Sequence, residues 1–191
     1  NALSYASSTL AVTMNLSAGT ASGGAGNDSF VNFENAIGSS TADLILGNSA
    51  ANSISGSSGD DTIEGGLGDD TLDGGAGSDA LSYASSPSAV TVNLSLNTVS
   101  GGAGNDSIRN FENIIGSSAA DSIIGNASAN SISGGSGNDT IDGGLGADTM
   151  DGGDGLDTLN YASSASAVTG NLAAGTASGG AGNDTFTGFE N

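Results

Sequence analysis

The chain contains no Cys, His, Trp or Lys, and its only basic side chain is a single Arg. These absences exclude disulfide bonds, thiolate and imidazole metal ligands, Cys or His nucleophiles and Schiff-base catalysis. No apolar run reaches transmembrane length, and no signal peptide is visible, so we expect no membrane insertion. The chemistry available to the chain is therefore that of oxygen atoms, from carboxylates, hydroxyls, amides and the backbone.

Positive charge is also nearly absent, because 21 Asp and Glu stand against one Arg and give a net charge of −20. Such a surface repels nucleic acid, so we exclude a DNA or RNA partner. It also makes a compact state costly unless cations are bound. The 34 glycines would suit a disordered chain, but 36% of the residues are hydrophobic and they are placed periodically, which favours a folded one.

A long repeat organises the chain. ALSYASS at 2–8 returns at 80–86, and both GGAGND and FEN recur with the same shift. We therefore expect two complete units, 1–78 and 79–156, and a partial third unit, 157–191, in one continuous solenoid. Because the first and last residues fall inside repeated motifs, we expect the chain to be a fragment of a longer protein.

A shorter period of nine residues runs inside each unit. Strict GGxGxD occurs eight times and a looser copy five times. All thirteen copies have an apolar residue at the eighth position: Phe30, Ile45, Ile54, Ile63, Leu72, Leu81, Ile108, Ile123, Ile132, Ile141, Met150, Leu159 and Phe186. The segment 83–100 lacks the motif, although 90–94 alternates apolar and polar residues like a half-buried strand, and 110–115 is a six-residue insertion.

Each nonapeptide has the composition of a turn followed by a short strand. The glycines allow a sharp turn, and the segment after the aspartate is β-prone with only its middle residue pointing inward. Two nonapeptides then close one coil, and successive coils stack as parallel strands. About ten coils at a spacing of about 4.8 Å predict a rod of roughly 50 Å.

Stacking places the sixth residue of each motif above its equivalent two nonapeptides earlier. We expect Asp43, Asp61 and Asp79 in one file and Asp121, Asp139 and Asp157 in another, with the files Asp28–Asn52–Asp70 and Asp106–Asn130–Asp148 weakened by their asparagines. A file of carboxylates is repulsive unless a cation lies between its members. Carboxylates and turn carbonyls form an all-oxygen cage, which suits Ca²⁺ better than Mg²⁺.

The motif GGxGxD followed by an apolar residue resembles the repeat of the RTX, or hemolysin-type calcium-binding, family. The resemblance covers thirteen nonapeptides. It implies an all-β fold, a right-handed parallel β-roll or β-solenoid, with calcium between stacked turns. It also implies type I secretion from Gram-negative bacteria and folding on contact with external calcium. The flanking segments are similar to those of serralysin-type secreted proteases, whose catalytic domain is not in this chain.

The expected cofactor is therefore Ca²⁺, with several ions in bands rather than in one continuous file. The predicted metal site comprises the motif aspartates and five turn glycines: Asp28, Asp43, Asp61, Asp70, Asp79, Asp106, Asp121, Asp139, Asp148, Asp157, Asp184, Gly65, Gly74, Gly134, Gly143 and Gly152. GSSTAD at 38–43 and GSSAAD at 116–121 lack two of the motif glycines, so the sequence does not decide the shape of these two turns.

Other acidic residues have different expected roles. Asp60 and Asp69, at the fifth motif position, are expected to set the shape of the turn. Glu34, Glu112 and Glu190, in the FEN segments, either cap the inserted loop, which we favour, or reach a cation. A catalytic carboxylate pair should be unique and lie in a pocket, whereas these carboxylates recur along a narrow rod, so we expect no enzyme active site.

Three functions remain open from the sequence. The first is a calcium-stabilised structural segment of a long bacterial extracellular protein, namely a surface layer, adhesin or filament. The second is the C-terminal calcium module of a secreted protease, lipase or epimerase. The third is an ice- or glycan-binding face, but the third motif positions lack the file of Thr that ice binding would need. The expected partners are calcium and copies of the chain or the rest of a longer repeat protein, outside the cell.

Overall fold

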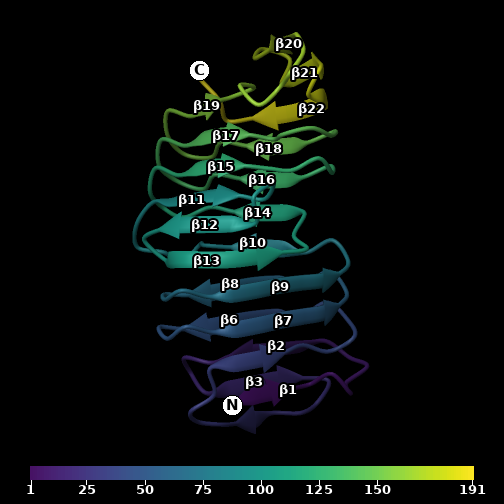
Figure 1. Ribbon diagram of the computed structural model, residues 1–191, viewed down its shortest axis with the longest axis vertical. Coiled ribbons are helices and arrows are strands. Elements are labelled where there is room, and N and C mark those ends of the chain that lie inside the picture. Colours follow the sequence, from purple (N-terminus) through teal and green to yellow (C-terminus); the bar gives the residue numbers. More distant parts are fainter.

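The computed structural model describes residues 1–191 and consists of stacked strands, with the N-terminus at one end of the stack and the C-terminus at the other (Figure 1). It contains no helix that is long and apolar enough to span a membrane. Two sheets face each other across a narrow core, and the chain crosses from one to the other at nearly every turn. The all-β roll predicted from the sequence is confirmed.

The first sheet has ten strands. In spatial order they are β1 (Ala2–Ser4), β5 (Asn35–Ile37), β7 (Ser53–Ser58), β9 (Thr71–Ala76), β13 (Gly104–Arg109), β12 (Thr98–Gly101), β11 (Val90–Asn93), β15 (Ser122–Ile124), β17 (Thr140–Asp142) and β19 (Thr158–Leu159).

The second sheet has twelve strands. In spatial order they are β20 (Val168–Asn171), β21 (Thr176–Gly179), β22 (Gly182–Thr187), β18 (Thr149–Asp151), β16 (Ser131–Ser133), β14 (Asn113–Ile115), β10 (Ala80–Ser82), β8 (Thr62–Gly66), β6 (Leu44–Asn48), β2 (Val12–Asn15), β3 (Thr20–Gly23) and β4 (Asp28–Ser29).

Most neighbouring strands are parallel, and within the runs of regular nonapeptides they have the predicted register, in which a residue pairs with its equivalent two nonapeptides later. Ser53 pairs with Thr71 and Thr140 with Thr158. In each such strand the apolar eighth-position residue points into the core, as it does at Ile54, which is 1% exposed, and at Ile141, which is fully buried. Eleven of the thirteen eighth-position residues are buried, and the other two, Phe30 and Leu159, pack against the same core.

Each unit interrupts this regular stack with an antiparallel hairpin where the sequence analysis expected a continuous roll. In the second unit β11, β12 and β13 pair antiparallel in succession, and β13 returns to lie parallel to β9. The glycines of GGAGND close the tight connection between β12 and β13, with Gly101 paired to Gly104 at positive φ. This copy of the motif therefore folds as a hairpin turn because its first residues end an antiparallel strand.

Successive hairpins lie in opposite sheets. Each unit consists of one short strand, one hairpin and five further strands, and these seven elements alternate between the two sheets. Because seven is odd, the next unit begins in the opposite sheet. The hairpins β2–β4 and β20–β22 lie in the second sheet, and β11–β13 lies in the first. Each hairpin adds two strands to its sheet only. The resulting mismatch in sheet length is offset by the next hairpin on the opposite side.

Candidate metal sites

The aspartates at the sixth motif position line the turns along the rod, and all but one are buried. Those in the buried class are Asp43, Asp61, Asp70, Asp79, Asp106, Asp121, Asp139, Asp148, Asp157 and Asp184, whereas Asp28 is exposed. Burying so many carboxylates is unfavourable unless each is paired or hydrogen-bonded. Their partners therefore decide what each turn can bind.

One carboxylate oxygen of each regular turn binds the neighbouring coil. The backbone N–H of Asp43 donates to Asp61 Oδ1 at 2.7 Å, and that of Asp61 donates to Asp79 Oδ1 at 2.8 Å. The backbone N–H groups of Asp121 and Asp139 donate in the same way to Asp139 and Asp157, at 2.7 and 2.8 Å. The structure thus stacks both of the all-aspartate files in the predicted order.

The two files that contain asparagine differ from the prediction. The N–H of Asn52 donates to Asp70 Oδ1 at 2.8 Å, and the N–H of Asp70 donates to Asp106 Oδ1 at 2.9 Å. The equivalent file in the next unit runs Asn130, Asp148, Asp184. Asp106 therefore follows Asp70 and does not precede Asn130, because the hairpin turns the chain back and lays β13 against β9.

The second carboxylate oxygen has no partner in six of these aspartates. The six buried, unpaired Oδ2 atoms belong to Asp61, Asp70, Asp79, Asp139, Asp148 and Asp157. Each lies over the first glycine of its own motif; for five of the six this is one of the glycines predicted at the site, Gly65, Gly74, Gly134, Gly143 or Gly152, and for Asp61 it is Gly56. Buried acceptors without donors are rare and costly, and a cation with oxygen ligands would supply the partner that these atoms need.

Carbonyl oxygens converge on the same points. A Cβ added to Gly56 would collide with both Asp61 Oδ2 and the carbonyl oxygen of Gly74 in the next coil. The same pairing of an unpaired carboxylate oxygen with a carbonyl oxygen occurs at Gly134, from Asp139 and Gly152. No three acidic side chains gather at one point. The ligand set that fits is therefore mixed carboxylate and carbonyl oxygen, which is the chemistry of Ca²⁺.

Burial raises the pKa of these carboxyl groups, and neighbouring carboxylates add to the effect. The pKa of Asp61 is raised to about 7, and the pKa values of Asp70, Asp139 and Asp148 are raised to about 6. The main cause in each case is loss of hydration, opposed by the hydrogen bond from the adjacent backbone. Without a cation these groups hold their protons to a higher pH than ordinary carboxyl groups do, and a bound cation would lower their pKa values again.

Four sixth-position residues satisfy themselves within their own turns. In GSSTAD the N–H and hydroxyl of Ser39 both donate to the Asp43 carboxylate, and Ser117 does the same for Asp121. The side-chain oxygens of Asn52 and Asn130 accept the N–H groups of Asn48 and Asn126. The unpaired oxygens are therefore confined to two bands, 61–79 and 139–157, and the banding of the calcium sites stays a prediction.

Tyrosine hydroxyls close the hairpin copies of the motif, a role that the sequence analysis missed. Tyr83 Oη donates to Asp106 Oδ2 at 2.6 Å, Tyr161 to Asp184 at 2.9 Å and Tyr5 to Asp28 at 2.7 Å. Burial raises the pKa of Tyr83, so it stays a protonated donor. The constant spacing between Tyr and Asp in these three pairs was visible in the sequence, but nothing local indicated that the two side chains meet.

Two other groups of acids accept backbone N–H groups from a neighbouring coil. The Oδ1 atoms of Asp60 and Asp69 accept the N–H groups of Ser78 and Asn105 at 2.9 Å, so these residues join adjacent turns, which differs from the expectation that they shape their own turns. Glu112 Oε2 accepts the N–H of Asp79 at 3.0 Å and Glu190 Oε2 accepts that of Asp157 at 2.9 Å, so both bind the end of a file of aspartates and not the inserted loop itself.

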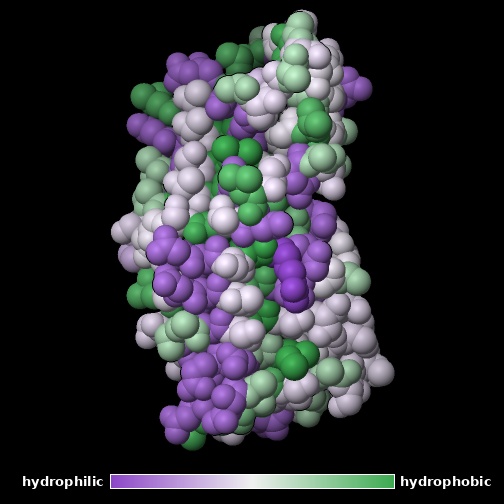
Figure 2. Space-filling view, in the orientation of Figure 1, coloured by the Kyte–Doolittle hydropathy of each residue, from purple (hydrophilic) through white to green (hydrophobic).

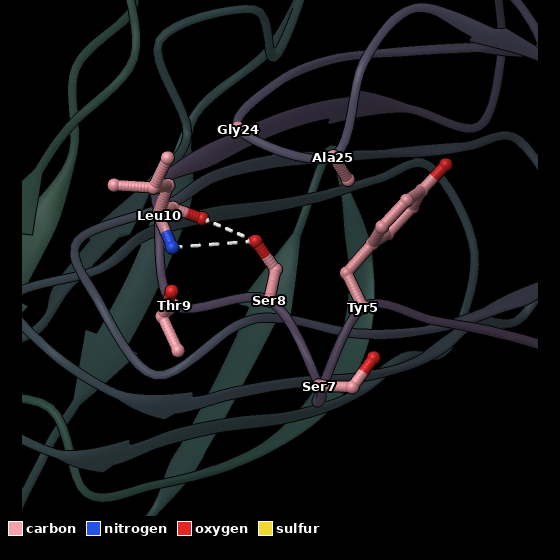
Figure 3. Close-up of a pocket in the computed structure, with 7 residues that line it drawn as sticks. All are labelled: Tyr5, Ser7, Ser8, Thr9, Leu10, Gly24 and Ala25. Atoms are coloured by element: carbon pink, nitrogen blue, oxygen red, sulfur yellow. Dashed lines mark hydrogen bonds between the residues drawn. The ribbon is translucent and has the colours of Figure 1, made fainter.

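A shallow hollow in the first hairpin is lined by Tyr5, Ser7, Ser8, Thr9, Leu10, Gly24 and Ala25 (Figure 3). The Ser8 hydroxyl donates to the Leu10 carbonyl at 2.8 Å and accepts the Leu10 N–H at 3.3 Å, so it shapes the local turn. Hydroxyl and glycine residues dominate the lining, and no acidic or basic side chain is among them. The unpaired carboxylate oxygens lie elsewhere, in the stacked turns.

A known family of repeats matches most of the chain. The family model of the RTX calcium-binding nonapeptide repeat matches residues 37–81, 96–109, 111–141, 124–159 and 169–190. The crystal structure of extracellular lipase LipA from Serratia marcescens is similar to the chain with a TM-score of 0.35 and 17% identity, and the match covers 84% of this chain and 38% of the lipase chain. No curated protein sequence matched the chain.

Removing calcium should unfold the roll at neutral pH and much less at mild acidity. The pKa values raised to about 6–7 mean that the metal-free folded state binds more protons than the unfolded chain between about pH 4 and 7. Its stability is therefore greatest below about pH 4 and falls as the pH rises through 6–7. Circular dichroism of calcium-depleted protein should show more β signal at pH 5 than at pH 7.5. An equal signal at both values, or full signal at pH 7.5, would contradict this account.

Asp61→Asn should have opposite effects with and without calcium. The substitution removes a carboxylate that the bound ion needs, so the calcium midpoint of folding should rise by at least about tenfold, or ~1.4 kcal/mol. In calcium-free buffer the variant should be at least as stable as the wild type, because a buried charge has been removed. Asp60→Asn, at the exposed neighbouring position, is the matched control and should change neither value appreciably.

Tyr83→Phe should destabilise the roll even at saturating calcium. It leaves Asp106 Oδ2 buried without its donor, which should lower the free energy of unfolding by about 1–3 kcal/mol. Tyr5→Phe removes the same bond at the exposed Asp28 and should cost much less. Urea unfolding of both variants measures the difference, and equal losses would show that burial of the pair is not what matters.

Proposed function

Since the chain belongs to the RTX calcium-binding nonapeptide repeat family, we propose that it serves as a structural segment of a long bacterial extracellular protein, namely a surface layer, adhesin or filament. The repeats identify it as a calcium-binding β-roll segment of a secreted bacterial protein. The proposal concerns what the segment does there. It holds a rigid, calcium-dependent shape and performs no chemical step of its own.

The observation that carries the proposal is the continuity of hydrogen bonding across the unit boundary. β10 belongs to the second unit and pairs with β8 of the first on one side and with β14 on the other. The N–H of Asp61 donates to Asp79 across the same boundary. Each unit is therefore the template for the next, which is how stacked repeats extend into long rods.

The alternation of the hairpins supports the same role. Units of similar sequence present their hairpins on opposite sides, so the repeat of the rod in space is two units of sequence. Such a rod stays straight on average and offers equivalent surfaces on both sides. The visible face mixes hydrophilic and hydrophobic residues along its length (Figure 2).

The absence of catalytic function is part of the proposal. The buried carboxylates repeat from turn to turn and bind backbone N–H groups of adjacent coils. A catalytic pair would need two carboxyl groups in distinct environments beside a substrate pocket. Here the environments are copies of one another, which suits repeated metal binding.

The location of the full-length protein tests the proposal in the bacterium that produces it. Immunogold labelling and cell fractionation should find the protein attached to the surface, and calcium chelation should detach it or disorder its array. Protein released freely into the medium, with calcium needed only for an attached enzyme activity, would contradict the proposal and favour the calcium module of a secreted enzyme.

Two internal deletions sharpen this test. Removing residues 1–156 shortens the rod by two units and keeps every downstream hairpin on its original side, so surface assembly should persist. Removing residues 79–156 deletes one unit, so every later hairpin moves to the opposite side of the rod. This variant should disturb assembly although fewer residues are lost. Equal behaviour of the two variants would show that the geometry of the rod has no part in its function.

A further inference from the structure

The inserted segment 110–115 follows the file of Asp43, Asp61 and Asp79 and occupies the place of the next regular turn. In the regular stack, the backbone N–H of a sixth-position residue donates to the aspartate one coil later, as from Asp61 to Asp79 at 2.8 Å. The N–H of Asp79 has no such aspartate above it. It donates instead to Glu112 Oε2 at 3.0 Å, so the glutamate of the insertion occupies the position of the missing carboxylate.

The carbonyl oxygen that lies beside the unpaired carboxylate oxygen of a regular turn is also replaced at the junction. In the regular turn, the point above Gly56 is approached by Asp61 Oδ2 and by the carbonyl oxygen of Gly74. At the junction, the point above Gly74 is approached by Asp79 Oδ2 and by the carbonyl oxygen of Asn110. Asn110 adopts a left-handed backbone with φ of 58°, a conformation that asparagine tolerates better than most residues.

The oxygen atom at the centre of this arrangement has no partner. Asp79 is fully buried, and its Oδ2 makes no hydrogen bond. No positive side chain is available to balance Asp79 and Glu112, because the single Arg, Arg109, is exposed and pairs with Asp73 at 2.7 Å. Asp79 is buried and Glu112 is half-buried, and two neighbouring carboxylates in such a place are unfavourable without a counter-charge. Burial and the charge of Glu112 accordingly raise the pKa of Asp79.

The same arrangement recurs one unit later. Asp157 is fully buried with an unpaired Oδ2, its N–H donates to Glu190 Oε2 at 2.9 Å, and the carbonyl oxygen of Gly188 lies over Gly152. Gly188 also has a left-handed backbone, with φ of 70°. The geometry is thus a property of the unit and does not depend on whether the carbonyl comes from Asn or Gly.

We propose that the inserted segment of each unit completes a calcium site at the unit junction, formed by the carboxylates of Asp79 and Glu112 and the carbonyl oxygen of Asn110, with Asp157, Glu190 and Gly188 forming the next. Two carboxylates and a carbonyl are hard oxygen ligands that suit Ca²⁺. The ion ties the last turn of one file to the segment that starts the next stretch of the roll. Calcium therefore stabilises the junctions between units as well as the turns within them.

Glu112→Gln separates this site from a role in capping alone. The amide oxygen of glutamine can still accept the N–H of Asp79, so a capping role predicts no change, whereas a metal site loses a charged ligand. Folded Glu112→Gln should bind one calcium ion fewer than the wild type in equilibrium dialysis. Glu64→Gln is the matched control, because the Glu64 carboxylate accepts hydrogen bonds from the hydroxyls of Ser82 and Ser85 and not from the backbone of a motif aspartate. Unchanged stoichiometry and affinity in Glu112→Gln would overturn the proposal.

Anomalous diffraction from crystals of the wild-type chain grown with calcium gives a test that does not depend on the variant folding. A peak between Asp79 and Glu112 is expected. Peaks at Asp61 without one at this junction would overturn the proposal while leaving the calcium binding of the regular turns intact. Neither measurement depends on the surface role proposed above, so the two proposals can fail separately.

Discussion

The whole structure depends on the burial of aspartate carboxylates between stacked turns. One oxygen of each carboxylate bonds the backbone of the neighbouring coil, which fixes the spacing and register of the coils. The other oxygen is left without a partner in Asp61, Asp70 and Asp79 and in their counterparts one unit later. A single inward side chain per strand makes a thin core, so the roll needs the additional free energy that cation binding supplies at these oxygens.

The residues around each motif aspartate determine whether its second carboxylate oxygen needs a cation. Ser39 and Ser117 satisfy their aspartates through the turn itself, and Tyr83 satisfies Asp106 through a side chain from the start of the hairpin. The aspartates of the loose copies GSSTAD and GSSAAD and of the strict copy GGAGND at 101–106 are thus all hydrogen-bonded, although the donors differ. The unpaired carboxylate oxygens are concentrated in two bands, and between the bands the buried carboxylates are hydrogen-bonded within the protein. The proposed junction sites would extend each band to the boundary of the hairpin.

The hairpins also determine how the units relate to one another. Because each unit takes an odd number of steps between the sheets, its neighbours are turned to the opposite side of the rod. Two extra strands in one sheet are then offset by two in the other. A unit with an even number of steps would place every hairpin in one sheet and the rod would curve. The long sequence repeat is therefore also a geometric constraint on the shape of an extended array.

The coil, the core residues and the oxygen chemistry of the chain could all be predicted from the repeat pattern. A period of nine with one apolar residue and one aspartate predicts coils built from two nonapeptides, inward Ile54 and Ile141, and stacked carboxylates that require a hard cation. Which carboxylates are unpaired depends on contacts that form only when the chain is folded. The order Asp70–Asp106, the bond from Tyr83 to Asp106 and the approach of Glu112 to Asp79 all follow from the hairpin that reverses the chain. These contacts join residues 23 to 36 positions apart, a separation that no local pattern of side chains encodes.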